Sequence, residues 1–270
     1  MSRRKDGELV PGDDGLPARS VGPWAERKAY YVDRYASMFA TGMKGRWPRR
    51  AYVELFAGPG RLYEDESGRF LAGSPIRSLE REFTNRVFIE MNPVAAGALS
   101  ERLRGSGASA RVLHGDCNAV IGAAIEAIPR PALTLAFVDP TNWQVRFETI
   151  ERLVTARKTD LLVTFMYGFM KRVATDDPAA LTAFFGTPEW KERLGGARWE
   201  VLDGLASLYN TQLERLGYLP SFSRRIIVPN TKKVPMYALV LFSKHRRGVE
   251  FWEKAIGGET ETGQRPLPGF

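Results

Sequence analysis

Four acidic residues, each directly after a short hydrophobic run, are the feature of this sequence that most suggests chemistry. They are Glu54, Glu90, Asp116 and Asp139. Glu54 also stands just before a turn that contains two glycines, in the segment "ELFAGPG" (54–60). Carboxylates pair with cationic groups and accept hydrogen bonds from hydroxyl and amino groups. A ligand held by these four residues would therefore carry positive charge, hydroxyl groups or both.

Three classes of nucleotide ligand compete for the glycine turn. A P-loop ends in Gly-Lys-Ser/Thr, which this chain lacks. A dinucleotide site needs G-x-G-x-x-G with its helix starting at once. Here only Gly58-x-Gly60 is present, and the next predicted helix begins 14 residues later. S-adenosylmethionine carries no phosphate but has a sulfonium and an amino group, charges that suit Glu54. Glu90 suits the two ribose hydroxyls of that ligand, and Asp116 suits the exocyclic amine of adenine.

The elements that must position these acids form an alternating series. Hydrophobic runs predict strands at 51–56, 86–90, 110–116, 132–140 and 160–168, and helices at 93–103, 118–128 and about 145–157. The strands are nearly continuous apolar runs, which is typical of a parallel sheet buried on both faces. Alternating strands and helices predict a doubly wound α/β fold, in which ligands bind at the carboxyl ends of the strands. We therefore expect the four acids at one edge of the sheet.

The remaining chain adds flanking elements to this sheet. We predict an aromatic helix at 23–41, an insertion at 61–73, and a helix that Ser74 caps and Pro75 begins. The segment 169–200 is aromatic-rich and irregular, with one helix near 178–185. A helix at 201–216, an antiparallel hairpin from "RRIIVPN" and "MYALVLFSK", and a helix at 248–256 follow. We predict a single domain over 23–256, a disordered N-terminal tail at 1–22 and a C-terminal tail at 257–270.

Four motifs carry a resemblance to a known family. "VELFAGPG", "FIEMNP", "LHGDCN" and "FVDP" resemble the successive motifs of class I S-adenosylmethionine-dependent methyltransferases. More narrowly, "YVELFAGPGRL" followed by "GSPIRSLE", after an aromatic and basic helix, resembles the three-Cys-motif partner protein family, TcmP. This resemblance covers about residues 24–170. It implies a Rossmann-like, mostly parallel sheet that closes with an antiparallel hairpin, and S-adenosylmethionine as the cofactor.

The resemblance also implies which residues bind the cofactor. Glu54 and the glycine turn would hold the methionine part, Glu90 the ribose, and Asp116 with the Cys117 backbone the adenine. The full set of implied cofactor-binding residues is Glu54, Phe56, Ala57, Gly58, Gly60, Glu90, Met91, Asp116, Cys117 and Asp139.

Asp139, Pro140 and Trp143 are the candidate catalytic residues. Asp139 and Pro140 stand where amino-methyltransferases keep an acidic or amide residue, two prolines and an aromatic residue. There the side chain and a backbone carbonyl accept hydrogen bonds from the target amine while the aromatic ring stacks on the base. This sequence has "DPTNW" instead, so the stacking role would pass to Trp143. That departure from the pattern counts against methylation of a base nitrogen without excluding it.

The charge distribution suggests a polyanionic partner. The formal net charge is +8, and residues 1–50 and 221–270 each carry a net charge of +5 around a near-neutral centre. Such a field attracts RNA or DNA, although a solvated basic surface explains it equally well. If the C-terminal hairpin lies beside the cleft, its basic residues would bind phosphates. These residues are Arg224, Arg225, Lys232 and Lys233.

Other chemistry is disfavoured. Cys117 is the single cysteine, so no intrachain disulfide can form, and no Cys/His cluster predicts a zinc site or another metal. No apolar run reaches the roughly 20 residues that cross a bilayer, and the N-terminus lacks the apolar region of a signal peptide. We therefore expect a cytoplasmic protein without a membrane partner.

Two functions remain open at this stage. The first is a methyltransferase that acts on a nucleic-acid base nitrogen. The second is a non-catalytic protein that binds S-adenosylmethionine or a related nucleotide as the partner of another protein, such as the three-Cys-motif protein. Asp139 separates them, because only the catalytic hypothesis needs this residue.

Overall fold

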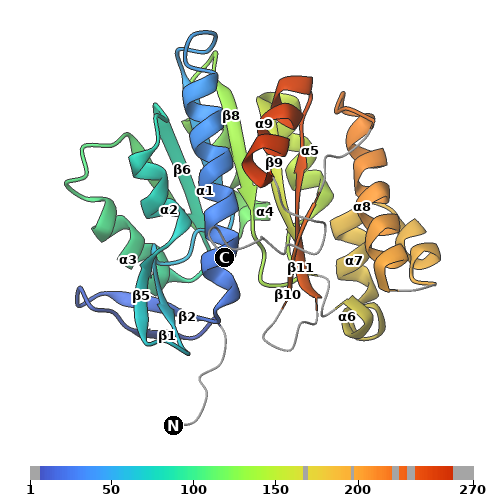
Figure 1. Ribbon diagram of the computed structural model, residues 1–270, viewed down its shortest axis with the longest axis horizontal. Helices are drawn as coiled ribbons and strands as arrows, with labels where there is room; N and C mark the ends of the chain where they lie inside the picture. The colour runs from blue at the N-terminus through green and yellow to red at the C-terminus, as the bar shows by residue number, and fades with distance from the viewer. Residues whose placement is uncertain (1–6, 167–169, 196–197, 221–224, 230–234, 258–270) are drawn as a thin grey trace, which may run out of the picture.

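A seven-stranded sheet forms the centre of the molecule (Figure 1). The computed structural model describes residues 7–166, 170–195, 198–220, 225–229 and 235–257. The strand order is β10-β11-β9-β8-β3-β6-β7. The strands are β3 (Arg50–Glu54), β6 (Asn85–Glu90), β7 (Ala110–His114), β8 (Leu133–Val138), β9 (Lys158–Phe165), β10 (Ile226–Pro229) and β11 (Pro235–Phe242).

Five of these strands pair in parallel, and β11 alone runs in the opposite direction. β3 pairs in parallel with both β6 and β8, and β7 and β9 extend this sheet on either side. β11 is antiparallel to both β9 and β10. All five residues of β3 are buried, as its continuous apolar run predicts. The predicted α/β fold with a C-terminal antiparallel hairpin is thus confirmed.

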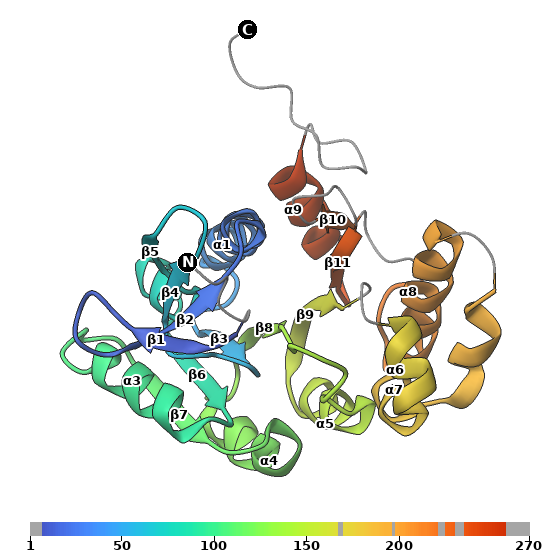
Figure 2. The same cartoon turned by 90° about the horizontal axis from the view of Figure 1, so that it is seen from below.

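Helices cover both faces of the sheet (Figure 2). The apolar cluster on one face contains residues of α1 (Trp24–Gly42), α3 (Pro93–Leu103) and α9 (Arg246–Ile256). The cluster on the other face contains residues of α4 (Cys117–Ala127), α5 (Phe147–Ala156), α7 (Pro178–Phe185) and α8 (Arg198–Glu214). No helix in the described part of the chain is long and apolar enough to cross a membrane.

The prediction of a disordered N-terminal tail is wrong for residues 9–21. These residues form β1 (Leu9–Pro11) and β2 (Pro17–Val21). The predicted insertion at 61–73 folds as a hairpin of β4 (Arg61–Glu64) and β5 (Arg69–Ala72). Together they make a small sheet of order β1-β2-β4-β5. These strands are only three to five residues long, which is too short for a clear local hydrophobic pattern, and the parallel pairing of β2 with β4 joins the two hairpins. The predicted tail at 258–270 lies outside the described residues.

The aromatic-rich segment 169–200 is more helical than predicted. It contains α6 (Met170–Asp176), α7, a 3-10 helix (Pro188–Arg193) and the start of α8. Phe184, Phe185 and Trp190 are buried and belong to the core cluster beside α5. Its aromatic residues thus cover one face of the sheet.

The helix after β5 also differs from its prediction. It is a single turn, α2 (Ser74–Arg77), followed by a 3-10 turn (Ser78–Glu80). Gly73 occupies the capping position, so Ser74 is the first helical residue instead of the cap. The Ser74 side chain is thereby left for another contact, described below.

Candidate active site

A cleft of about 270 Å³ lies at the carboxyl ends of β3 and β8, where the sequence predicted a ligand. Its walls come from α1, β2, the glycine turn after β3, and the loop after β8. Of the predicted site residues, those that line the cleft are Glu54, Phe56, Ala57, Gly58, Gly60, Asp139 and Pro140. The cleft thus gathers residues from segments far apart in the sequence.

The backbone of the glycine turn is fixed by its own geometry and by neighbouring strands. Gly58 and Gly60 have φ angles of +64° and +82°, in the left-handed region that glycine adopts easily. A Cβ atom on Gly60 would lie 2.8 Å from Leu99 Cδ1, so a larger residue would have to displace this side chain. The amide of Ala57 donates to the carbonyl of Ile89 at 2.9 Å. Glycine at position 60 is therefore required both for conformation and for packing.

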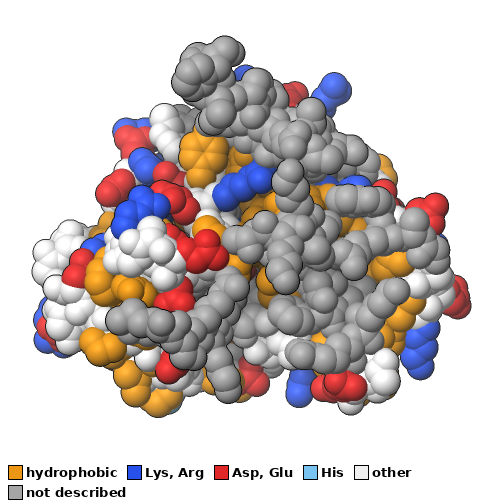
Figure 3. Space-filling model, turned by 60° about the horizontal axis from the view of Figure 1, so that its bottom comes forward, with side chains coloured by type: hydrophobic (Ala, Val, Ile, Leu, Met, Phe, Trp, Pro, Cys, Tyr) orange, Lys and Arg blue, Asp and Glu red, His pale blue; other side chains and the backbone are white. Residues whose placement is uncertain are grey.

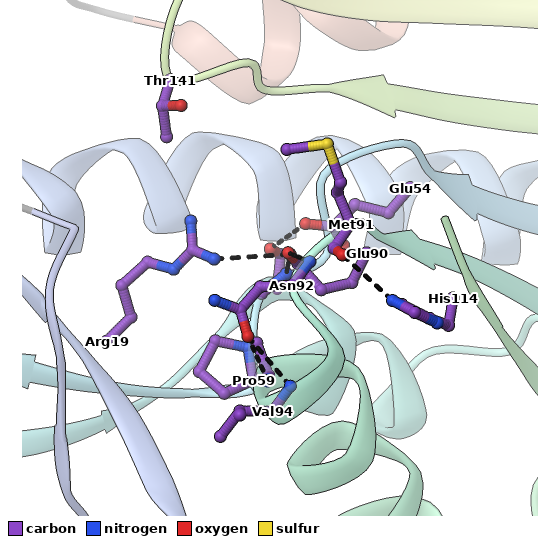
Figure 4. Close-up of polar contacts among 12 residues, drawn as sticks. Arg19, Glu54, Pro59, Glu90, Met91, Asn92, Val94, His114 and Thr141 are labelled. Carbon is purple, nitrogen blue, oxygen red and sulfur yellow. Dashed lines mark hydrogen bonds and ion pairs between the residues drawn. The ribbon is translucent and has the colours of Figure 1, made fainter. Parts of the chain in front are cut away.

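Glu90 holds this turn in shape (Figure 4). Its Oε2 accepts a hydrogen bond from the Gly58 amide at 2.7 Å, and its Oε1 accepts one from the Asn92 amide at 2.8 Å. Arg19 of β2 lies 3.4 Å from the same Oε2. Glu90 is only 6% exposed, and neither it nor Met91, which is 64% exposed, lines the cleft. The ribose contact predicted for Glu90 and the cofactor contact predicted for Met91 stay predictions.

Glu54 is a buried acid at the base of the cleft. It accepts hydrogen bonds from Ser74 Oγ at 2.6 Å and from the Tyr52 hydroxyl at 3.1 Å. Burial, together with the nearby Asp139 charge, raises the pKa of Glu54 to about 8 despite the lowering effect of the Ser74 hydrogen bond. Glu54 is therefore largely protonated at neutral pH. A cationic ligand beside it would favour the ionised form and be bound more tightly for that reason.

Asp139 forms an ion pair with Lys28 of α1 across the cleft. The Lys28 Nζ and Asp139 Oδ2 atoms are 2.5 Å apart, and both side chains are about one-fifth exposed (22% and 19%). The Lys28 ammonium also lies 5.0 Å from the centre of the Tyr237 ring. The sequence analysis missed Lys28. Lys28 stands four residues from both Trp24 and Val32 on α1, so the three side chains share one helix face, and that face lines the cleft. This spacing is the signal that could have identified Lys28.

Arg19 is a second cation in the cleft that the sequence analysis missed, because its segment was predicted to be disordered. Its Nε atom is buried and has no hydrogen-bond partner among the described residues. The guanidinium lies over Gly58, 3.5 Å from the place where a side chain would begin. The cleft therefore carries two acids, Glu54 and Asp139, and two cations, Lys28 and Arg19, of which Arg19 retains an unused donor.

The stacking role predicted for Trp143 is wrong. Trp143 is 2% exposed, and its ring lies 4.8 Å from that of Phe184 and 5.8 Å from that of Phe185, measured between centroids. The ring belongs to the core under α7 and does not line the cleft. Pro140 and Thr141 line it instead, beside Asp139.

Asp116 and Cys117 lie at the end of β7, outside the cleft. Asp116 is exposed and caps α4, because its Oδ1 accepts a hydrogen bond from the Asn118 amide at 3.0 Å. Cys117 is buried, and burial raises the pKa of its thiol to about 12, so it packs as a small apolar residue. The adenine contact predicted for these two residues stays a prediction.

Most of the basic residues predicted to bind nucleic acid lie outside the described part of the chain. Arg224, Lys232 and Lys233 lie outside the described residues. Arg225 is ion-paired with Asp203, and its side chain is 13% exposed. On the described part of the face in Figure 3, acidic and basic side chains are interleaved. Within the residues that the structure describes, no group of His, Cys, Asp and Glu is arranged to hold a metal ion.

Comparisons with known proteins show the fold. No family model and no curated protein matches the chain. An O-methyltransferase from Bacillus cereus, solved with S-adenosylhomocysteine, is 13% identical with a TM-score of 0.50, over 86% of each chain. Trm1 from Pyrococcus horikoshii, solved with S-adenosylmethionine, is 12% identical with a TM-score of 0.49. That match covers 96% of this chain, which spans only 65% of the Trm1 chain. The strand order and the Bacillus cereus structure identify the class I methyltransferase fold.

Proposed function

We propose that this chain is an S-adenosylmethionine-dependent methyltransferase whose target is a nitrogen of a nucleic-acid base. One observation carries the proposal: Asp139, at the end of β8, and the glycine turn, at the end of β3, line the same cleft. In a class I methyltransferase fold this arrangement puts a cofactor and a nucleophile next to each other.

The charges of the cleft fit the cofactor. S-adenosylmethionine carries an ammonium, a carboxylate and a sulfonium group. Glu54 offers a buried acid for the ammonium, since a cation is what would bring its raised pKa back down. Arg19 offers an unused buried donor for the carboxylate.

When bound, this cofactor supplies a methyl group on a positively charged sulfur, which a nucleophile attacks in line. The residues of the chain then act mainly by position. The Asp139 carboxylate accepts a hydrogen bond from the target amine and aligns its lone pair. Lys28 holds Asp139 in place through their ion pair. A base must leave its stack to reach this depth, so single-stranded or flipped bases are the expected form of the target.

The choice of nucleic acid as the target is supported by charge. The formal net charge of +8, concentrated in the first and last 50 residues, favours a polyanion. Binding of such a target should weaken steeply as the salt concentration rises.

A second candidate is a protein that binds the cofactor or a related nucleotide without catalysis. Two observations favour it. Lys28 already engages Asp139, and the aromatic residue of the "DPTNW" segment is buried in the core. The narrower resemblance to the TcmP family remains a hypothesis. Under this candidate the three-Cys-motif protein is the expected partner.

Transfer of tritiated methyl groups to pooled RNA and single-stranded DNA separates the two candidates. We expect transfer by the wild type, and at least a hundredfold slower transfer by Asp139→Asn, whose amide is a weaker acceptor and no longer pairs with Lys28. S-adenosylhomocysteine binding to Asp139→Asn should change less than about threefold. Glu148→Gln, an exposed substitution on α5, is the matched control. Tight binding without transfer to any nucleic acid would favour the second candidate, and absence of binding would contradict both.

A further inference from the structure

A second cavity of about 270 Å³ lies at the opposite end of the sheet, at the amino ends of β8 and β9. Its lining residues come from the C-terminal part of α1, the first residues of β8 and β9, and α9, whose places in the fold Figure 1 shows. It shares no lining residue with the cleft, and all of its lining residues belong to the described part of the chain. The proposed methyltransfer makes no use of it.

Three large aromatic side chains, Phe39, Trp47 and Phe251, line this cavity. Phe39 is buried, while Trp47 and Phe251 are half-buried and face the cavity together with Leu133. Such side chains provide flat apolar surfaces, on which a ring stacks edge to face or offset. A ligand that fits here has a flat apolar body.

Two cationic side chains at this cavity lack a counter-charge. Lys158 lies with its Nζ 5.2 Å from the centre of the Trp47 ring, and Arg247 is half-buried on the first turn of α9. No carboxylate among the described residues pairs with either of them. Arg247 gains most from an anionic partner, because it is half-buried and its surroundings replace only part of its hydration, whereas Lys158 is exposed. Lys244 is different, since its Nζ donates to the Val154 carbonyl at 3.0 Å.

One acid also lines the cavity and must be taken into account. Asp160 is buried, and its two oxygens accept hydrogen bonds from the Tyr35 hydroxyl at 2.9 Å and from Ser243 Oγ at 2.7 Å. Burial raises the pKa of Asp160 to about 6. Both of its oxygens are thus engaged by hydroxyl groups of the protein. Even with Asp160 ionised, the three cationic side chains that line the cavity, Lys158, Lys244 and Arg247, outnumber this acid.

We propose that this cavity binds a small aromatic anion, with its ring against Trp47 and Phe251 and its carboxylate or phosphate toward Lys158 and Arg247. The shape of the walls selects the ring, and the two unpaired cations select the charge. The proposal is independent of the methyltransferase assignment, because it uses other residues at the other end of the sheet.

A matched pair of probes tests it by calorimetry. 2-Naphthoate and 2-naphthamide have nearly the same shape but differ in charge. We expect the wild type to bind 2-naphthoate at least tenfold more tightly than 2-naphthamide. The Lys158→Gln/Arg247→Gln variant should lose that preference and still bind the amide. Lys191→Gln/Arg193→Gln removes the same two residue types from an exposed site elsewhere and should keep the preference.

A cavity-filling variant locates the binding. Met43 lines the cavity and is half-buried, so Met43→Trp should abolish binding of both probes, with an unchanged melting temperature as the check on folding. The proposal is overturned if the wild type binds neither probe. It is equally overturned if the two double variants behave alike, or if folded Met43→Trp binds the probes as the wild type does.

Discussion

At the scale of single residues, the cleft is a balance of two acids and two cations, and the sequence motifs identified only the acids. Glu54 and Asp139 end hydrophobic strands and could be predicted from that position alone. Lys28 and Arg19 come from α1 and β2, and only the folded chain brings them to the cleft. Trp143 is the opposite case, because the sequence analysis predicted a place for it in the site and the structure buries it in the core. Its distance from Asp139 suggested stacking, but Phe184 and Phe185, some 40 residues later, take it into the core.

Arg19 gives the sharpest prediction at this scale. If its guanidinium binds the cofactor carboxylate, Arg19→Ala should weaken S-adenosylhomocysteine binding about tenfold, or ~1.4 kcal/mol. It should weaken binding of 5′-methylthioadenosine, which lacks the amino-acid part, less than about threefold. Calorimetry of both ligands makes the comparison. Arg61→Ala, on β4 of the same small sheet, is the control, because Arg61 pairs with Asp13 instead. Equal losses for the two ligands would show that Arg19 acts only through Glu90 and the turn.

At the scale of elements, the small sheet is fastened to the glycine turn by one side chain of α3. Arg102 donates to both Asp14 oxygens at 2.7 Å and to the Pro17 carbonyl at 2.8 Å. It also donates to the Pro59 carbonyl, within the turn, at 2.6 Å. Its side chain is 7% exposed. This single residue therefore links the N-terminal strands to the glycine turn.

Arg102→Ala should lower the free energy of unfolding by about 2–3 kcal/mol, since several hydrogen bonds to a charged group are lost at once. It should also weaken S-adenosylhomocysteine binding, because the turn and β2 lose their link. Urea denaturation and calorimetry provide the two readouts. Arg104→Ala, whose side chain is 74% exposed and pairs with Glu101, should change stability by less than about 0.5 kcal/mol. A loss for Arg102→Ala no larger than for Arg104→Ala would refute the linking role.

The elements also show what local pattern can and cannot predict. The bounds of α3 and α7 match their predictions because apolar periodicity and proline starts specify them. The strands of the main sheet were visible as apolar runs. β1, β2, β4 and β5 were not, because strands of three to five residues are too short to show a clear hydrophobic pattern. These strands are held in place by contacts such as that of Arg102 with Asp14, which joins residues 88 positions apart.

At the scale of the whole molecule, two buried acids couple stability to pH. The pKa values of Glu54 and Asp160 rise on folding, from 4.5 and 3.8 to about 8 and about 6, mainly through burial. Between the unfolded and folded pKa values the folded state binds more protons. The free energy of unfolding should therefore fall as the pH rises from about 5 to 8. Acids with lowered pKa values, such as Asp14 at about 2, act in the opposite sense but at lower pH.

Melting temperatures at pH 5 and pH 8 test this prediction. Each kcal/mol lost should lower the melting temperature by about 2–4 °C for a chain of this size. The Glu54→Gln and Asp160→Asn variants carry no ionisable group at these positions, so each should flatten the dependence of the melting temperature on pH. The effect of Glu54→Gln should extend to higher pH, because the pKa of Glu54 is the higher of the two. A profile that stays flat or rises in the wild type, or a slope unchanged in both variants, would be inconsistent with buried protonated acids.

The central claim is that the cleft at the carboxyl ends of β3 and β8 binds S-adenosylmethionine. The most direct measurement is calorimetric titration of S-adenosylhomocysteine into the wild type and into Glu90→Ala. We expect micromolar binding to the wild type, and at least tenfold weaker binding to a folded Glu90→Ala, which loses the acceptor of the Gly58 amide. No binding of either S-adenosylmethionine or S-adenosylhomocysteine to the wild type would contradict the claim and leave a methyltransferase fold that holds some other ligand.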